Sequence, residues 1–366
     1  MNPADCFAQT YTEARLKFLA AAASAGLAVR SHEHPQRGRD GEPLAMDVVR
    51  EGTADASALL VVSSACHGVE GFCGSGVQVA LLRDDAWHAA VAASGVAVLY
   101  VHALNPYGFS WWRRTTHENV DLNRNFLDFS QPLPPSAAYD ELASAIVPET
   151  WPAPADAVAR LTAYASAHGE RGLQAAITGG QHTHPHGLFY GGREATWSQR
   201  TLRSVLREHG AICARLGWID VHTGLGPSGE AELIFAGRDE AQAVARARAW
   251  WGPQVTSICD GSSASARLSG LMCLAAYEEC AQAEYTGIAL EYGTVPMAEV
   301  IDALRADQWL HNHAHSQGGR NHSIKRQMRD AFYVDTPEWK QRVVEQALDA
   351  ARHGLAGLAR PPSVVS

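Results

Sequence analysis

The chain has 366 residues, of which 46% are hydrophobic and 19% are charged, a composition typical of a folded globular protein. Thirty Lys and Arg residues against 39 Asp and Glu residues leave a formal net charge of −9, which gives no electrostatic support to nucleic-acid binding. No stretch of about 20 residues is both apolar and free of charges, so we expect no membrane-spanning helix.

Seven cysteines are scattered along the chain without a CxxC pair, which predicts free thiols in a reducing cytoplasm. They are Cys6, Cys66, Cys73, Cys213, Cys259, Cys273 and Cys280. The first 29 residues do not fit a secretory signal, because Asp5 precedes the apolar part and Glu13 and Lys17 interrupt it. We expect an amphipathic helix there, ended by Gly26.

Short apolar runs then alternate with segments of helical periodicity. Strands are expected at 58–64, 95–106, 217–224, 230–237 and 286–294, and helices at 74–85, 198–216, 238–251 and about 336–358. This alternation predicts the α/β class, with a mixed, mostly parallel sheet and helices on both faces.

The segment 131–157 is rich in proline and alanine, and we expect a surface excursion around short helices. Strands of the same kind continue beyond it, so it does not read as a linker. We therefore predict one domain over 1–366, with the motif-bearing core in about 58–295 and a helical part in about 296–358.

Polar side chains follow the apolar runs, at the strand ends where sheets of this kind bind ligands. They are His67, Glu70, Asn105, His222 and Glu291. His67 and Glu70 are three residues apart and can converge on one ion. Together with His222 they form two imidazoles and a carboxylate, a recurrent set in catalytic zinc sites that leaves one position open. Asp220, two residues before His222, is a candidate to orient that imidazole.

The loop-rich segment 105–126 carries a second group of candidates. They are Arg113, Arg114, Asn123 and Arg124. Arginine binds a carboxylate through two N–H groups, and it also stabilises a developing oxyanion. In an isolated position such residues are ordinary surface charges, but here they accompany a candidate metal site.

Several motifs occur in an order that resembles the M14 zinc carboxypeptidase superfamily, which includes the aspartoacylase and succinylglutamate desuccinylase branch. These motifs are HGVEG, NPYG…WRRT…DLNRNF, DVHTG and LEYGT, within roughly residues 58–295. In addition, GLFYGG (187–192) and TWSQRTLR (196–203) are similar to the DUF2817 group of bacterial M14-like proteins. The resemblance implies a zinc-carboxypeptidase-like fold and a single zinc ion.

The resemblance also implies a role for each matched residue. His67, Glu70 and His222 would hold the zinc ion. Glu291, in ALEYGT, matches the general base that deprotonates the attacking water and then protonates the leaving nitrogen.

The matched arginines have separate roles. Arg113, in WRRT, matches the residue that polarises the scissile carbonyl, with Arg114 as its competitor, and Asn123 and Arg124 match the pair that grips a terminal carboxylate. The superfamily's mobile active-site tyrosine has no secure counterpart, and the candidates are Tyr277 and Tyr285.

Three further features are weaker candidates for chemistry. HTHPHG (182–187) has three alternate histidines but reads as a loop, and HNHAH (311–315) ends a helix, where histidines suit the dipole. Cys66 precedes His67, yet a buried cysteine at a strand end is the commoner case.

The sequence thus predicts a zinc-dependent hydrolase that cleaves an amide next to a free carboxylate, in a small peptide or an N-acyl amino acid. NPYG, WRRT and LEYGT favour a carboxypeptidase, whereas HGVEG favours an acylase of the aspartoacylase or desuccinylase type. The alternative from another class is a non-catalytic module that binds carboxylated ligands. Neither a nucleic acid nor a membrane is an expected partner.

Overall fold

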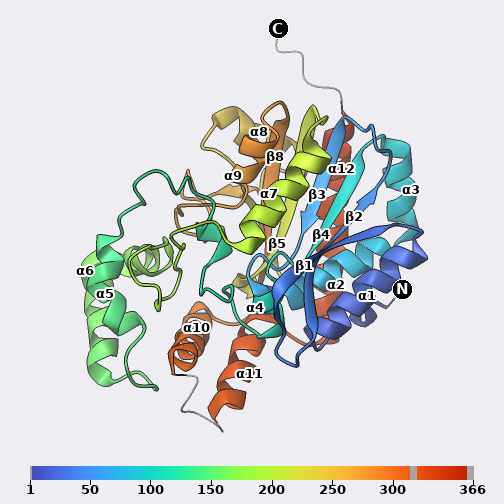
Figure 1. Ribbon diagram of the computed structural model, residues 1–366. Helices are drawn as coiled ribbons and strands as arrows, with labels where there is room; N and C mark the ends of the chain where they lie inside the picture. Colours follow the sequence, from blue (N-terminus) through green and yellow to red (C-terminus); the bar gives the residue numbers. More distant parts are fainter. Residues whose placement is uncertain (1, 314–319, 361–366) are drawn as a thin grey trace.

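The computed structural model describes residues 2–313 and 320–360 and contains an eight-stranded sheet (Figure 1). Its strand order is β1-β2-β4-β3-β5-β8-β6-β7. The strands are β1 Val29–Arg37, β2 Pro43–Glu51, β3 Ala58–Ser63, β4 Ala97–His102, β5 Arg215–Ser228, β6 Ala231–Phe235, β7 Thr256–Ser257 and β8 Glu284–Gly293.

The centre of the sheet is parallel and its flanks are mixed. Strands β4, β3, β5 and β8 pair in parallel, whereas β1 with β2, β2 with β4, and β6 with β8 pair antiparallel. Every residue of β3 and β4 is buried, as the continuous apolar runs predict for strands covered on both faces.

Helices cover both faces of the sheet. The α-helices are α1 Tyr11–Ser24, α2 Gly71–Leu82, α3 Asp85–Ser94, α4 Pro106–Ser110, α5 Ala137–Ile146, α6 Ala155–Thr178, α7 Trp197–Gly210, α8 Ala241–Trp251, α9 Leu274–Glu279, α10 Met297–Asn312, α11 Arg320–Phe332 and α12 Pro337–Ala359. Three short 3₁₀ helices are η1 Pro3–Cys6, η2 Gly68–Glu70 and η3 Leu122–Arg124.

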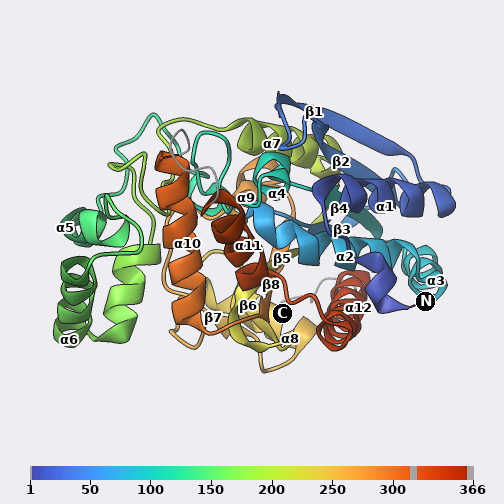
Figure 2. The same ribbon diagram turned by 90° about the horizontal axis from the view of Figure 1, so that it is seen from below.

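Alternate residues of β3 face two separate cores. Leu60 and Val62 share one cluster with side chains of α1, α2, α3, α8 and α12, while Leu59 and Val61 share another with α7 and α9. Viewed from below, the group of α1, α2, α3 and α12 lies on the side of the sheet opposite α7 (Figure 2). The predicted α/β class, with a mostly parallel sheet and helices on both faces, is confirmed.

The N-terminal helix and the predicted strands are also confirmed, with small changes in their bounds. Gly26 follows α1 with φ of +70°, a left-handed conformation that favours glycine at a helix end. The sequence patterns did not predict β1 and β2. Most of β1 is exposed, so this edge strand lacks the apolar alternation that marks a half-buried strand.

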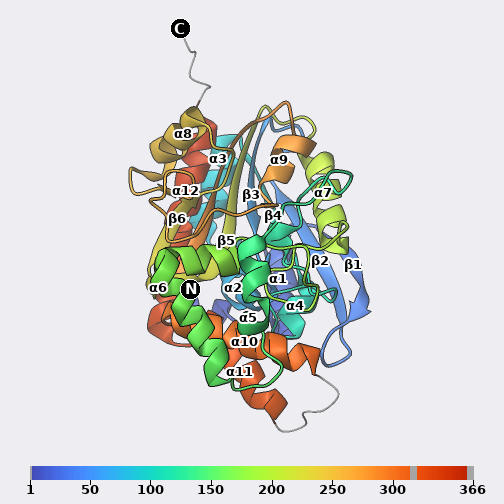
Figure 3. The ribbon, with the colours of Figure 1, turned by 90° about the vertical axis from the view of Figure 1, so that its left-hand side faces the viewer.

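The excursion 131–157 leads into α5 and α6, which lie in front of the sheet in Figure 3. Helix α10 is hydrogen-bonded to α5. Arg305 of α10 donates to the carbonyls of Ile146 (2.8 Å) and Ala145 (3.0 Å). No helix within the described part of the chain is long and apolar enough to cross a membrane.

Candidate metal centre and active site

The turn that carries His67 and Glu70 begins where β3 ends and includes η2. Two backbone hydrogen bonds hold it against the segment 105–126, with Gly68 N–H donating to the carbonyl of Arg114 (3.1 Å) and Val69 N–H to that of Arg113 (2.8 Å). A Cβ atom on Gly68 would lie 2.1 Å from the carbonyl carbon of Gly108. The glycine therefore permits a close approach that fixes the turn in a buried position.

Four donor atoms of three side chains converge at this turn. His67 Nδ1 lies 2.9 Å from Glu70 Oε1, and His222 Nδ1 lies 3.0 Å from Glu70 Oε2. The two Nδ1 atoms are 3.3 Å apart, and all three residues are buried, with at most 4% of each exposed. His222 comes from β5, beside β3 in the sheet, so parallel pairing brings the two strand ends together.

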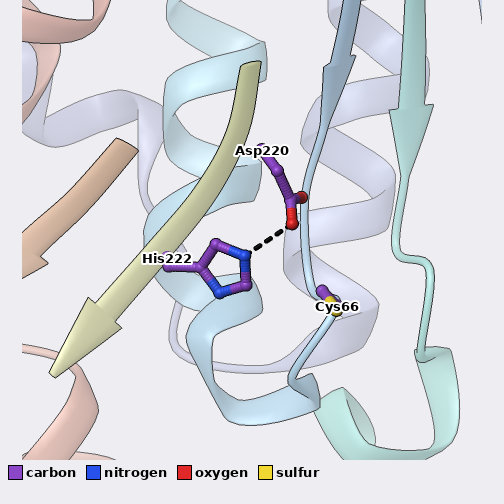
Figure 4. Close-up of side chains that lie close together, drawn as sticks. All are labelled: Cys66, Asp220 and His222. Carbon is purple, nitrogen blue, oxygen red and sulfur yellow. Dashed lines mark hydrogen bonds and ion pairs between the residues drawn. The ribbon is translucent and has the colours of Figure 1, made fainter. Parts of the chain in front are cut away.

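The opposite nitrogen of each imidazole faces a carboxylate. His222 Nε2 lies 2.5 Å from Asp220 Oδ2, as Figure 4 shows, and His67 Nε2 lies 3.2 Å from Asp121 Oδ1. Ser63 in turn donates a hydrogen bond to Asp220 (2.5 Å). At His222, the carboxylate favours the imidazole tautomer with the proton on Nε2, which leaves Nδ1 free to bind a metal.

This donor set fits a zinc ion. Zn–N distances of about 2.0–2.1 Å in a tetrahedral site place two nitrogen ligands about 3.3–3.4 Å apart. The separation of the two Nδ1 atoms matches that value. One carboxylate between two imidazoles, each backed by a further carboxylate, is also the ligand chemistry that zinc prefers.

The charges around the site reinforce one another. Burial opposes the ionisation of Glu70, but His67 and His222 outweigh it and hold the pKa of Glu70 below its usual range. Burial likewise opposes a charge on His222, yet Asp220 and Glu70 raise the pKa of His222 well above its ordinary value. Asp121 stays ionised, because Arg114 and His67 outweigh its burial and hold its pKa well below the usual range.

Glu291 lies beside this centre on β8, in register with His222 on β5. It is 8% exposed, lines the same pocket, and its Oε1 accepts a hydrogen bond from the N–H of Leu225 (3.0 Å). Burial and the nearby Glu70 carboxylate raise the pKa of Glu291 to about 8, against the opposing effect of His222. The carboxyl group therefore exchanges its proton near neutral pH, and a bound cation would shift it towards the ionised form.

The two adjacent arginines point to different places. Arg114 lines the pocket, where its Nε donates to Asp121 (2.8 Å) and its Nη2 lies 2.8 Å from His67 Nε2. Arg113 does not line it. Its side chain is 97% buried among other partners, with Nε 3.3 Å from Asp307 on α10 and Nη2 2.9 Å from Asn119. The structure thus brings Arg114, and not Arg113, to the candidate centre.

Asn123 and Arg124, from η3, both line the pocket. The Arg124 guanidinium donates to the carbonyl of Thr178 through Nη2 (2.5 Å) and Nε (3.1 Å), and to that of Asn123 through Nη1 (2.8 Å). Asn123 Oδ1 accepts a hydrogen bond from the N–H of Met272 (2.9 Å). Burial lowers the pKa of Arg124 to about 10, so the side chain is still a cation at neutral pH.

Cys66 lies close to Asp220 and His222 (Figure 4). Ligand atoms of Cys66, Asp220 and His222 lie within 4.8 Å of one another. The thiol is fully buried, and burial together with Asp220 raises the pKa of Cys66 well above its ordinary value. A protonated, buried thiol fits a packing role better than that of a nucleophile.

Within the described residues, the three histidines of the motif at 182–187 do not converge on a metal position. His182 contacts the carbonyl of Gly192 (2.7 Å), whereas His184 contacts Asp140 (3.0 Å). Among the described residues, the groups with metal-binding geometry are those around His222. For the motif at 311–315, residues 314 and 315 lie outside the described part of the chain.

Of the remaining candidates, one lines the pocket and two do not. Asn105 caps α4 and donates to the carbonyl of Arg114 (3.2 Å), so it supports the site from outside the pocket. Tyr285 lines the pocket, while Tyr277 does not and accepts a hydrogen bond from the N–H of Arg238 (3.1 Å).

Sequence reasoning missed two residues of this site. Asp121, which faces both His67 and Arg114, stands inside the DLNRNF motif, so its place beside Asn123 was the available signal. Phe189 lines the pocket from the GLFYGG segment, and nothing local to that segment indicated its position.

Apolar side chains form most of the remaining pocket wall. They come from β6, β8, the segment 258–273 and α10, and include Ile234, Ala289, Ile258, Leu271, Met272, Val300 and Leu304. A polar centre beside an apolar wall is the usual composition of a small-molecule site.

Comparisons with known proteins give a family and distant structural similarities. A search of curated proteins finds no match. The carboxypeptidase A of Helicoverpa armigera is similar at 12% identity and a TM-score of 0.44, over 88% of this chain and 74% of that one. Thrombin activatable fibrinolysis inhibitor is similar at 12% identity and a TM-score of 0.46, over 96% of this chain and 74% of that one. The family model "Protein of unknown function (DUF2817)" matches residues 7–346, and the chain belongs to this family.

Proposed function

We propose that this protein is a zinc-dependent hydrolase that cleaves an amide bond next to a free carboxylate, in the manner of a carboxypeptidase. The observation that carries the proposal is the convergence of His67, Glu70 and His222 in one pocket with Glu291 and two arginines. The three convergent residues would hold the zinc ion. When bound, it would supply Lewis-acid chemistry, activating water and polarising the scissile carbonyl.

Pocket side chains would bind the substrate and stabilise the charge that develops on it. Arg124 and Asn123 would bind the terminal carboxylate of the substrate, because the Thr178 carbonyl already orients the Arg124 guanidinium in the pocket. Arg114, held by Asp121, would donate to the carbonyl oxygen as negative charge develops there. This role, expected for Arg113, passes to Arg114 because Arg113 is buried against Asp307.

Glu291 would move the proton. Its carboxylate would take a proton from the attacking water as the C–O bond forms, and would then return that proton to the leaving nitrogen as the C–N bond breaks.

The first experiment compares a zinc-loaded and a chelated sample on dipeptides and on N-acyl amino acids. Cleavage of both substrate classes only in the zinc-loaded sample is expected, with dipeptides preferred. Preference for N-acyl amino acids would instead assign the protein to the deacylase type. Tight binding of these ligands without turnover would support the non-catalytic module.

Glu291→Gln is the variant that separates an enzyme from a binding module. Glutamine keeps the shape and the hydrogen bond from Leu225 but cannot accept the proton, so the variant should fold, retain zinc and bind substrate. We expect kcat to fall by about 10²–10⁴-fold, as for the loss of a general base. Near-normal turnover in the zinc-loaded variant would remove Glu291 from this role.

We also infer a reducing compartment such as the cytoplasm. Six of the seven cysteines are buried, and no disulfide joins any of them in the described part of the chain. Cysteines in this number without disulfides are typical of proteins kept under reducing conditions.

A further inference from the structure

Phe189 combines an unusual backbone conformation with a place in the pocket wall. Its φ is +52°, a left-handed conformation that is strained for a residue with a bulky side chain. The side chain is 3% exposed and lines the pocket that holds the candidate metal ligands. Such strain persists only where the surroundings impose it, and it is often found at functional sites.

Hydrogen bonds to the carbonyls of Phe189 and of the next residue hold this segment in place. Its own carbonyl accepts a hydrogen bond from the N–H of Gln181 (3.2 Å). The next carbonyl, of Tyr190, accepts one from the N–H of Asp121 (2.8 Å), the residue that caps η3 and faces His67. The backbone around Phe189 is therefore tied directly to the element that carries Asn123 and Arg124.

The ring of Phe189 lies within reach of both pocket arginines. The guanidinium carbon of Arg114 is 5.0 Å from the ring centroid, and that of Arg124 is 5.6 Å from it. Both values fall inside the roughly 6 Å range of cation–π attraction. Two cations in one buried pocket repel each other, and the negative face of an aromatic ring offsets part of this repulsion, in addition to the Asp121 carboxylate that pairs with Arg114.

We propose that Phe189 is a positioning residue that holds the guanidinium groups of Arg114 and Arg124 in place to receive a carboxylate-bearing substrate. The proposal rests on the proposed function for the identity of the substrate, but the binding of a carboxylate to the two arginines can be measured without turnover. The strained backbone is the consequence of directing the ring towards these two guanidinium groups.

The test uses two variants that remove the aromatic face but keep a side chain at the strained position. Phe189→Leu is smaller, and Phe189→Met fills more of the volume with a flexible chain, so at least one should fold. Phe189→Tyr keeps the ring and serves as the rescue variant. Phe126→Leu is the matched control, because Phe126 is 2% exposed and its ring centroid lies 5.6 Å from the guanidinium carbon of Arg203, yet it does not line the pocket.

The first readout is the binding of 3-phenylpropionate, which has no amide bond to cleave, by calorimetry, with the uncharged 3-phenylpropanamide as the comparison ligand. We expect Phe189→Leu and Phe189→Met to weaken carboxylate binding by about 5–30-fold, the range of a desolvated cation–π contact. Binding of the amide, zinc affinity and carboxylate binding by Phe189→Tyr and Phe126→Leu should each change by less than about threefold.

The second readout is steady-state kinetics with a dipeptide. In the Leu and Met variants KM should rise through the loss of Arg124 alignment, and kcat should fall through that of Arg114. Unchanged carboxylate binding in both variants, equal losses for the acid and the amide, or no carboxylate binding by the wild-type protein would overturn the proposal. A selective loss of carboxylate binding in a protein that hydrolyses no substrate would instead uphold Phe189 and contradict the proposed hydrolase activity.

Discussion

At the residue scale, Arg113 and Arg114 show how two neighbours of the same type serve different purposes. Arg113 joins the loop to α10 through Asp307, which also pairs with Lys325 (2.6 Å). Arg114 lies over the candidate metal ligands. Residue 112, Trp112, has φ of +53°, and this left-handed turn of the backbone precedes the divergence of the two side chains.

Exchanging each arginine for glutamine should therefore give different phenotypes. Arg114→Gln should lower kcat by about 10²–10³-fold, because it removes the donor to the developing oxyanion. Arg113→Gln should leave kcat within a few-fold but lower the free energy of unfolding by about 1–3 kcal/mol, because Asp307 loses one of its buried partners. Kinetics and urea unfolding of both variants check this. A large kcat effect confined to Arg113→Gln would restore the role to Arg113.

At the scale of elements, the site depends on how closely the η2 turn packs against α4. Gly68→Ala should push these elements apart, since the new Cβ would meet the backbone of Gly108 at 2.1 Å. We expect a loss of about 1–3 kcal/mol in stability from overpacking, together with a weaker affinity for zinc.

Chelator competition and urea unfolding measure the two effects of Gly68→Ala. Gly95→Ala is the control, because Gly95 has φ of +68° but no atom within 4 Å of the position of a Cβ. That variant should lose about 1–2 kcal/mol of stability and keep its zinc affinity. Equal zinc affinities in the two variants would show that η2 tolerates displacement.

The walls contributed by β6, β8 and α10 predict which substrates the pocket prefers. Ala289 is half-buried between buried neighbours on β8 and lines the pocket with Ile234. A charged substrate side chain would lose its hydration against this apolar wall. Dipeptides that end in Phe, Leu or Met should therefore be cleaved at least about 10-fold more efficiently than those that end in Lys or Glu.

Ala289→Leu tests the same wall from the opposite side. The larger side chain should fill part of the pocket and shift the preference in kcat/KM from Phe towards Ala at the substrate terminus. The comparison of the two substrates within one variant cancels any change in zinc content. An unchanged ratio would place the substrate side chain elsewhere.

At the scale of the whole molecule, the buried histidines make stability depend on pH. His102, in the core, stacks on Phe18 with ring centroids 4.3 Å apart, and burial lowers its pKa to about 4. Its pKa in the unfolded chain is about 6.5. Below that pH the unfolded state binds the extra proton while the folded state does not, so stability is lost as pH falls from about 6.5 towards 4.

This linkage predicts the behaviour of His102→Gln. When the pH falls from 7.5 to 5, protonation of His102 in the unfolded chain should lower the unfolding free energy of the wild-type protein by about 2 kcal/mol. The variant lacks this histidine, so its unfolding free energy should fall by about 2 kcal/mol less over the same range. Urea unfolding of both proteins at the two pH values, without metal, measures the difference. Equal pH dependence in the two proteins would mean that His102 is protonated in the folded state.

The whole molecule also joins distant parts of the chain. The N-terminal α1 and the C-terminal α12 belong to one apolar cluster on the same face of the sheet. The prediction of one domain over the chain accordingly implies a single cooperative unfolding transition, which stays a prediction.

The sequence alone determined the features that follow from local residue patterns, namely the central strands and the polar residues at their ends. Continuous apolar runs specify the central strands β3, β4, β5 and β8, and the polar residues at their ends follow directly. Because parallel strands end at one edge of a sheet, the convergence of His67, Glu70, His222 and Glu291 was predictable from these runs.

Only the tertiary structure decided how the arginines divide and which further residues surround them. Arg113 pairs with a residue 194 positions away, and Phe189 reaches Arg114 and Arg124 from another segment. The hydrophobic periodicity of the sequence cannot predict such pairings, because these side chains meet only after the sheet has formed. The local pattern thus places a residue at the edge of a site, and long-range packing decides whether its side chain enters it.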